Sequence, residues 1–562
     1  MQPEKMYILH DSSEDSLLKT LLANRGITEE KEIEAFLNPH YEDHLHDPFL
    51  MPDMEKAVTR TLDAIEKDEH IAIFSDYDCD GIPGGVTLHD FFKAIGFINF
   101  QNYIPHRHDE GYGFNAGAVE KFKKDGANLI ITIDCGTVDH EAVEAAKAAD
   151  IPVIIIDHHE AGEQKPDVYA LLNPKCEDEY PFKGLCAAGV TYKFIQGLIA
   201  RGRERGMIDL PEGFEKWFLD MVGLATVADM VPLVGENRAL AHYGLKVLRK
   251  SRRPGVHHLA RKNGLKLPYI TEDDVGFTIG PRINAASRMD TPEDAFTLLA
   301  TTDEVEAGTR AAHLEKLNRE RKTTVAVMSR ELKRRLEKQT EIPNVIVIGN
   351  PEWKPALVGL SANSLVETYQ RPVFVWGRDG QGVIKGSCRS DGSVSVVELM
   401  QEAGHALLGF GGHKEAGGFS TSDEHIHILS DALNEAYEKL SATLSETEEV
   451  FVDTDLTLDA IDNSLLQTLR TLAPFGMGNP KPLFRFQNVM PESIEAFGKA
   501  GDHTTVTFNT KNGKRKAIAF FKKPGDFPHL KKEGCTIIAH VEESFFMGRK
   551  EIRLRIIDVM PV

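Results

Sequence analysis

Short apolar runs that alternate with helical stretches dominate the first half of the chain and restrict its possible folds. The apolar runs lie at 71–75, 128–133 and 153–156, and the helical stretches that follow the first two lie at 86–95 and 140–149. Strands that are apolar on both faces and joined by helices form a parallel sheet covered on both sides. We therefore expect an α/β fold here, with ligands bound at the carboxyl ends of the strands.

The rest of the chain is expected to form further folding units, because 562 residues exceed what one hydrophobic core supports. A helical connector is predicted at 241–340, and its charged stretch at 304–338 is interpreted as a solvated amphipathic helix rather than a binding surface. A second α/β segment is predicted at 341–447. Alternating β-type runs then predict a small β-barrel; they lie at 504–508, 516–521, 536–541 and 551–557.

Composition limits the possible partners and the compartment. The net charge of −21 argues against a surface that is positive throughout, so any contact with nucleic acid must be local. None of the six cysteines forms a C-x-x-C pair, which makes reduced thiols the expectation. The apolar runs are far shorter than the roughly 20 residues that span a bilayer. Because the N-terminus also lacks signal-peptide features, we expect a cytoplasmic protein without membrane contact.

The strongest local signal is SDYDCDG, in which Asp76, Asp78 and Asp80 follow the first apolar run. The same spacing begins the calcium loop of an EF-hand. That loop needs glutamate at its twelfth position, where this chain has Thr87, and it follows a helix rather than a strand. Closely spaced carboxylates repel one another unless positive charge lies among them, so a different divalent metal site is favoured.

Three more segments carry side chains of the same kind. TIDCG and IDHHE follow the second and third apolar runs, and ATVADMVPL is otherwise apolar; they place Asp134, Asp157, His158, His159 and Asp229. Taken alone, Asp229 is either a helix N-cap or a ligand, and the three other acidic segments favour the ligand. Mixed carboxylate and imidazole ligation suits Mn²⁺, with Mg²⁺ as a substitute.

These four motifs, in this order and spacing, resemble those of the DHH phosphoesterase superfamily. The resemblance continues through YIPHRHDEGYG, GPRINAASRMD, SCRS, GFGGHKEAGG and PFGMGNPKPLF. With these segments, nearly the whole chain resembles the RecJ exonucleases. This resemblance implies an N-terminal segment at 1–50, a DHH catalytic domain at 51–240, the connector at 241–340, a DHHA1 domain at 341–447 and an OB-fold at 448–562 that binds nucleic acid.

Site residues follow from the resemblance position by position. The implied metal ligands are Asp78, Asp80, Asp134, His158 and Asp229, with Asp134 bridging two ions. Asp76 and His159 would be further ligands or would hold phosphate. The positions implied to bind the 5′-terminal phosphate are Arg107, Arg282, Ser387 and Arg389, and His413 would contact the scissile phosphate. Phe74 departs from the family pattern, since some relatives have histidine there, and this implies fewer protein ligands for the first metal.

The activity implied by the resemblance is 5′ to 3′ exonuclease action on single-stranded DNA. It implies two-metal hydrolysis that releases 5′-mononucleotides, a role in DNA repair and recombination, a monomer, and a helicase and a single-strand-binding protein as helpers. A basic segment with interleaved phenylalanines at 508–532 is the predicted strand guide; it includes Lys514, Arg515, Lys516, Lys522 and Lys523. The alternative for this segment is a solvated barrel face over core phenylalanines.

Two other functions remain open from the sequence. The chain could be another DHH phosphoesterase, acting on oligonucleotides, cyclic dinucleotides or pyrophosphate, but that would leave the predicted barrel unused. It could also be a non-catalytic replication scaffold on the same fold. A scaffold could lose its carboxylates without penalty, whereas this chain retains the full set.

Overall fold

The computed structural model describes residues 4–10, 14–162, 164–176, 178–441, 447–498, 501–546 and 549–562. The chain forms two compact units. The larger unit comprises His46–Val231 and Tyr243–Leu444, and the smaller unit comprises Met1–Leu45, Pro232–His242 and Ser445–Val562. None of the helices in the described ranges has the length and apolarity needed to cross a bilayer.

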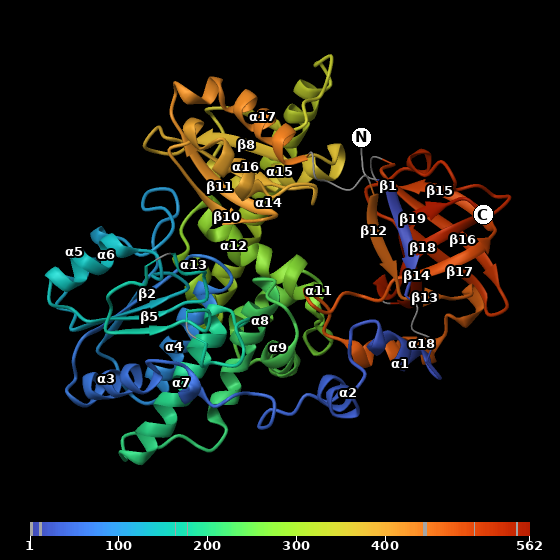
Figure 1. Ribbon diagram of the computed structural model, residues 1–562. Helices are drawn as coiled ribbons and strands as arrows, with labels where there is room; N and C mark the ends of the chain where they lie inside the picture. Colours follow the sequence, from blue (N-terminus) through green and yellow to red (C-terminus); the bar gives the residue numbers. More distant parts are fainter. Residues whose placement is uncertain are drawn as a thin grey trace. The chain divides into compact units, whose positions relative to one another are not determined.

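A five-stranded parallel sheet lies at the centre of the first half of the larger unit (Figure 1). In spatial order its strands are β3 (Phe100–Tyr103), β2 (Ile71–Ser75), β4 (Leu129–Ile133), β5 (Val153–Ile156) and β6 (Ala170–Leu172). This confirms the predicted parallel sheet and the three predicted strands. The pattern did not predict the edge strands β3 and β6, because β3 is only half-buried and partly polar and β6 has three residues.

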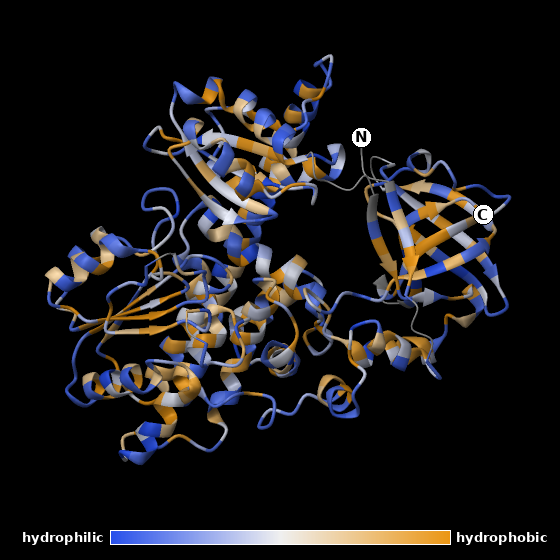
Figure 2. Ribbon diagram, viewed as in Figure 1, coloured by the Kyte–Doolittle hydropathy of each residue, from blue (hydrophilic) through white to orange (hydrophobic). Residues whose placement is uncertain are grey.

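Helices cover the sheet because its central strands are apolar on both faces. Every residue of β2, β4 and β5 is buried, and these strands are among the most hydrophobic segments in Figure 2. The helices of this region are α3 (Met54–Glu66), α4 (Gly81–Ala94), α5 (Ala116–Lys124), α6 (His140–Ala148) and α7 (Ala187–Glu204). Helix α4 begins before the predicted residue 86, although its first turns are rich in glycine and disfavour helix. A β-carbon at Gly84 would lie 2.8 Å from the Ile133 side chain, so close packing on the sheet requires glycine there.

Helices also form the connector, as predicted. They are α9 (Gly235–Leu248), which begins before residue 241, α10 (Pro254–Lys262), α11 (Glu272–Asp274), α12 (Gly280–Met289), α13 (Glu293–Ala300) and α14 (Glu304–Leu336). Helix α8 (Leu219–Ala228) precedes the connector and lies within the range predicted for the first α/β domain. The charged stretch predicted as an amphipathic helix is α14, which buries an apolar stripe that includes Leu314, Leu317, Met328 and Leu332. Helix α12 packs against α14 and carries the GPRINAASRM motif.

The second α/β region is also confirmed and has a five-stranded mixed sheet. In spatial order its strands are β10 (Gly409–His413), β11 (Ala416–Thr421), β9 (Ile384–Arg389), β8 (Val373–Arg378) and β7 (Ile346–Gly349). Only β7 and β8 pair in parallel. Its helices are α15 (Pro355–Tyr369), α16 (Val396–Glu402) and α17 (Leu429–Ser441).

The smaller unit contains a seven-stranded mixed sheet that curls around its own core (Figure 1), in agreement with the predicted C-terminal barrel. Its strands are β13 (Thr454–Asp455), β14 (Phe484–Val489), β18 (Cys535–Phe546), β19 (Arg549–Met560), β17 (Gly513–Ala519), β16 (His503–Thr510) and β15 (Pro491–Phe497). Strand β1 (Glu4–Leu9) pairs in parallel with β12 (Thr447–Val452). The helices are α1 (Leu17–Ala23), α2 (Glu30–Leu37) and α18 (Asn463–Leu472).

Residues from the two ends of the chain share one core in the smaller unit, which the sequence pattern did not predict. Leu21, Leu22 and Phe36 from α1 and α2 are buried with Phe484 and other residues of the C-terminal sheet. Arg238 connects these parts: its guanidinium lies 3.4 Å from the Phe36 ring centroid and donates hydrogen bonds to three backbone carbonyls. The predicted boundary at residue 50 stays a prediction.

Candidate metal centre

Side chains from four separate segments meet at the carboxyl ends of β2, β4 and β5. The Nε2 atom of His158 lies 3.3 Å from Asp134 Oδ1, 3.6 Å from Asp80 Oδ2 and 3.7 Å from Asp229 Oδ2. Three overlapping groups of possible ligand atoms, each within 4.8 Å, occur here: Asp134 with His158 and His159, Asp80 with His158 and Asp229, and Asp76 with Asp78 and Asp134. The structure thus brings together the seven residues that the sequence indicated as ligands or possible ligands.

Backbone amides hold two of these carboxylates in place. Asp80 accepts hydrogen bonds from the amides of Ala187 and Ala188, at 2.7 and 2.8 Å, at the start of α7. Such unpaired amides at a helix N-terminus favour a negative group. Asp78 Oδ1 accepts from the amides of Asp80 and Gly81. Gly81 permits this turn, because a β-carbon there would lie 2.5 Å from the Asp76 carbonyl oxygen.

Two buried carboxylate oxygens in the cluster have no hydrogen-bond partner among the described residues. They are Asp76 Oδ1 and Asp134 Oδ1. Asp134 also has a backbone φ of +66°, a conformation that residues other than glycine rarely adopt and that marks functional sites. An unpaired buried acceptor costs free energy, and a bound cation would satisfy both oxygens. The donor set therefore fits divalent metal ions.

Burial and mutual repulsion make the carboxylates hard to ionise. Burial, with the charge of Asp78, raises the pKa of Asp80 to about 7. Burial, with the charge of Asp80, raises the pKa of Asp229 to about 9. Asp229 follows the last residue of α8, so it does not N-cap that helix, and the negative end of the helix dipole further disfavours its charge. The pKa of Asp134 is raised for the same reasons, so positive charge is needed to ionise the set.

The two histidines have opposite electrostatic surroundings. Burial, with the neighbouring His159, lowers the pKa of His158 to about 4, which leaves its ring neutral and able to bind a cation. Burial also disfavours a charged His159, but a 2.7 Å hydrogen bond between its Nδ1 and Asp157 Oδ1 outweighs this and raises its pKa. His159 is therefore suited to hold a negatively charged group.

Asp157 lies beside the cluster, and the sequence assigned it no role. Burial would raise its pKa, yet hydrogen bonds from His159 and Thr137 hold the pKa below the usual range. Its Oδ1 also accepts the backbone amides of His158 and His159, which fixes the turn that carries both rings. Its position directly before the histidine pair was the signal available in the sequence.

The predicted phosphate-binding residues of the first region differ in their surroundings. Arg107 lies over the Tyr77 ring, 4.6 Å from its centroid. Arg282 is buried and donates to Glu315 at 2.6 Å, so a carboxylate already partners its guanidinium. Arg288 was not among the predicted residues; its guanidinium donates a hydrogen bond to the Ala356 carbonyl oxygen at 2.7 Å. Burial, with the charges of Arg107 and Arg321, lowers the pKa of Arg288 to about 9.

Ser387 and Arg389 lie side by side on β9 and face α15. A β-carbon at Gly359 of α15 would contact both side chains at 3.2 Å, so glycine leaves them room. His413 lies at the exposed end of β10, where its Nδ1 accepts from the amide of Glu415. In the described parts of the chain, no recorded hydrogen bond or ion pair links these three residues to the carboxylate cluster. Their predicted role in binding phosphate stays a prediction.

The predicted strand guide divides into two parts. Lys514 and Lys516 pair with Glu492 and Glu551, and the Arg515 guanidinium donates to backbone carbonyls, so these cations are partly engaged. Lys522 and Lys523 are exposed. The structure also buries two of the interleaved phenylalanines, Phe508 and Phe527. At these two positions the phenylalanines belong to the core, as the alternative interpretation of the segment predicted, and are not available to a DNA strand.

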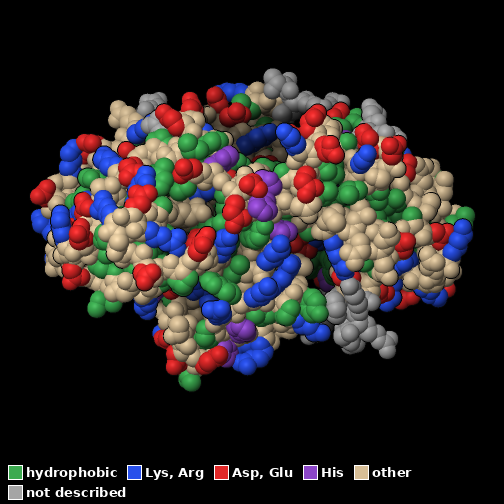
Figure 3. Space-filling model, turned by 90° about the horizontal axis from the view of Figure 1, so that it is seen from below, with side chains coloured by type: hydrophobic (Ala, Val, Ile, Leu, Met, Phe, Trp, Pro, Cys, Tyr) green, Lys and Arg blue, Asp and Glu red, His purple; other side chains and the backbone are tan. Residues whose placement is uncertain are grey.

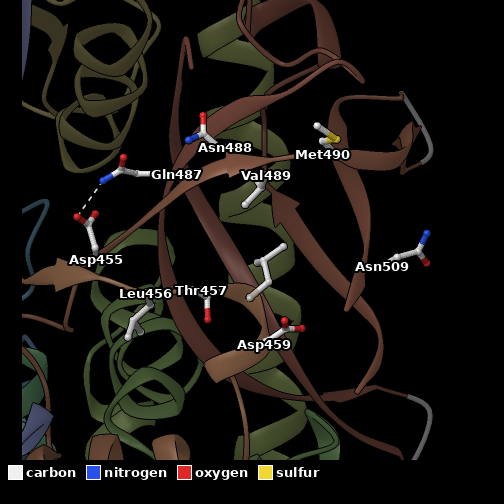
Figure 4. Close-up of a pocket in the computed structure, with 10 residues that line it drawn as sticks. Asp455, Leu456, Thr457, Asp459, Gln487, Asn488, Val489, Met490 and Asn509 are labelled. Carbon is white, nitrogen blue, oxygen red and sulfur yellow. Dashed lines mark hydrogen bonds between the residues drawn. The ribbon is translucent and has the colours of Figure 1, made fainter. Parts of the chain in front are cut away.

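A pocket of about 460 Å³ lies in the smaller unit, on the C-terminal sheet. Figure 4 shows Asp455, Asp459, Gln487, Asn488, Met490 and Asn509 around it, with Gln487 donating to Asp455 at 2.9 Å. Two carboxylates in its lining would repel phosphate. Figure 3 shows that acidic and basic side chains are both spread over the face that it presents.

Three family models match the chain in the order that the sequence implied. They are the DHH family, N-terminal domain, at residues 70–226, the DHHA1 domain at 343–446 and the RecJ OB domain at 452–558. These matches agree with the two α/β regions and the C-terminal sheet described above.

Curated relatives and solved structures match over most of the chain. The single-stranded-DNA-specific exonuclease RecJ of Bacillus subtilis is 34% identical and covers 96% of this chain and 67% of the relative, and that of Salmonella typhimurium is 31% identical and covers 83% and 82%. The crystal structure of RecJ in complex with Mn²⁺ from Thermus thermophilus matches with a TM-score of 0.83 and 25% identity, covering 100% of this chain and 80% of that one. The chain therefore belongs to the RecJ family of DHH proteins.

Proposed function

We propose that this protein is a single-stranded-DNA-specific exonuclease that hydrolyses phosphodiester bonds from the 5′ end and releases 5′-mononucleotides. The observation that carries the proposal is the convergence of Asp80, Asp134, His158 and Asp229 around one point, with a buried carboxylate oxygen of Asp134 that has no hydrogen-bond partner among the described residues. Relatives at 34% and 31% identity carry the name single-stranded-DNA-specific exonuclease, which supports the substrate class. A role in repair and recombination, with a helicase and a single-strand-binding protein, belongs to the same proposal.

We infer that two divalent cations bind here, Mn²⁺ in preference to Mg²⁺. The ligands would be Asp78, Asp80, Asp134, His158 and Asp229, with Asp76 as a further ligand. Structures of RecJ from Thermus thermophilus are described with Mn²⁺ and with Mg²⁺. When bound, such cations neutralise the charge of a phosphodiester and acidify a water molecule.

The side chains around the cluster have separate tasks. Asp157 holds His158 and His159 in one orientation through three hydrogen bonds, so that the neutral ring of His158 faces Asp80, Asp134 and Asp229. His159, whose pKa is raised, would donate a hydrogen bond to a phosphate oxygen. Arginines suit the terminal phosphate, because a planar guanidinium donates two hydrogen bonds at once. We assign the binding of the terminal phosphate to Arg107, Arg282 and Arg389, together with the hydroxyl of Ser387. We assign contact with the scissile phosphate to His413.

The test is a product ladder on 3′-labelled, 5′-phosphorylated single-stranded DNA with Mn²⁺, alongside a dinucleotide and pyrophosphate. We expect stepwise shortening from the 5′ end. Turnover of the small substrates alone would instead identify another kind of DHH phosphoesterase. Asp134→Asn should abolish hydrolysis and keep strand binding, whereas Asp167→Asn, a surface carboxylate paired with Lys147, serves as the control and should stay active. Full activity of Asp134→Asn would contradict the metal proposal.

A further inference from the structure

Four aromatic side chains gather at one end of the C-terminal sheet. Phe497 is the last residue of β15, His503 is the first of β16, and Phe520 and Phe521 directly follow β17. These strands are antiparallel neighbours, so the end of β15, the start of β16 and the end of β17 coincide. Phe497 and His503 stand directly opposite each other in the register. We call these four residues the aromatic cluster.

The rings of the aromatic cluster contact one another. The ring centroids of Phe497 and His503 are 5.0 Å apart, those of His503 and Phe520 are 5.6 Å apart, and those of His503 and Phe521 are 4.9 Å apart. The Arg553 guanidinium lies 5.5 Å from the Phe520 ring centroid. His503 is thus at the centre of the cluster and orients the rings around it.

Phe521 is exposed and strained, which folding alone does not explain. Its side chain is 81% exposed, whereas Phe508 and Phe527 nearby are buried. Its φ is +57°, a conformation that costs free energy in any residue but glycine, and most of all in a bulky one. The Phe521 amide donates to His503 Nδ1 at 2.8 Å, which holds the backbone in this conformation. A large ring is therefore presented to solvent at a cost in stability.

Positive charge lies next to the exposed ring. Lys522 and Lys523 follow it in sequence and are exposed, and neither pairs with a carboxylate in the described part of the chain. The Lys522 ammonium contacts the Ile557 carbonyl oxygen at 3.3 Å and lies 5.1 Å from the Phe527 ring centroid. Two carboxylates lie nearby: Asp502 is 3.7 Å from His503 Nε2, and Asp526 accepts a hydrogen bond from the Lys523 amide at 2.7 Å. An exposed aromatic face beside exposed lysines that have no carboxylate partner for their ammonium groups among the described residues is complementary to a nucleobase and its phosphates.

We propose that the aromatic cluster is a stacking site for an unpaired nucleobase, with Phe521 providing the contact face and Lys522 and Lys523 the phosphate contacts. The proposal rests on the proposed function, since it assumes a single-stranded nucleic acid as substrate. It places the strand contact at this end of β15, β16 and β17, rather than on Lys514, Arg515 and Lys516. Stacking is tolerant of sequence because every base has a flat face.

The test compares full-length wild type with Phe521→Gly, measuring the Kd for single-stranded DNA with divalent cations removed. Glycine accepts a φ of +57° without strain, so the variant should unfold at the same or a higher temperature. We expect its Kd to rise about tenfold, the loss of one stacked base. Phe521→Trp should keep the affinity, and its fluorescence should be quenched by the strand. Tyr269→Ala, which removes an exposed aromatic ring of the larger unit, is the matched control.

An abasic strand of the same length separates stacking from backbone contact. Phe521→Gly should bind the abasic strand as wild type does, and Lys522→Gln should weaken both strands and reduce the salt dependence of binding. An unchanged Kd for the base-containing strand in Phe521→Gly would overturn the proposal, as would an equal loss on both strands. Hydrolysis by wild type is measured in parallel. Its absence would refute the proposed exonuclease, whereas a missing effect of Phe521→Gly on binding would refute the stacking site alone.

Discussion

Removing divalent cations should make the stability of this protein fall as the pH rises. Asp80 is buried among other carboxylates, and its pKa rises from 3.8 to about 7 in the folded chain. Between these two values the folded state binds more protons than the unfolded state does. The contribution of Asp80 to the free energy of unfolding therefore decreases as the pH rises through this range and is constant above it.

The size of the effect follows from the pKa of Asp80. A rise from 3.8 to about 7 corresponds to about 4 kcal/mol in total, of which about 3 kcal/mol falls above pH 5. For a unit as large as the one that holds the site, this lowers the unfolding temperature by about 3 °C. Asp134 and Asp229 have raised pKa values for the same reasons, so the combined decrease should be larger.

The assay is thermal unfolding of chelated protein at about pH 5 and about pH 8, followed by circular dichroism, with and without added Mn²⁺. The cation should stabilise the protein more at the higher pH, because it replaces the protons that the carboxylates lose. Asp134→Asn removes one charge and should weaken the pH dependence in chelated protein. Asp167→Asn, at an exposed position, should leave it unchanged. Equal unfolding temperatures at both pH values in chelated wild type would refute the reasoning.

Three further substitutions have defined outcomes. Gly81→Ala should weaken Mn²⁺ binding, measured by calorimetry, because its β-carbon would lie 2.5 Å from the Asp76 carbonyl oxygen; unchanged affinity would contradict this. Arg238→Ala should destabilise the smaller unit by about 3 kcal/mol in urea unfolding, since three backbone carbonyls lose a charged donor; a loss below about 1 kcal/mol would count against it. Arg389→Ala should remove the preference for a 5′-phosphate over a 5′-hydroxyl in competition binding, and a retained preference would exclude its role.

Local sequence was enough to predict the α/β fold and the members of the carboxylate cluster. Strands β2, β4 and β5 are apolar throughout, which only a sheet covered on both faces accommodates. Their carboxyl ends lie at one edge, so the acidic residues that follow them had to be close together. Because of this common edge, a metal site could be predicted there before any distance was known.

Only the tertiary structure decided which of these groups are paired and which are exposed. It buried Phe508 and exposed Phe521, although both are phenylalanines of the same basic segment. It paired Arg282 with Glu315 and left Arg288 without a carboxylate partner among the described residues. It also joined α1 and α2 to the core of the C-terminal sheet. Each of these depends on residues far apart in the chain, and the period of a local pattern carries no information about such contacts.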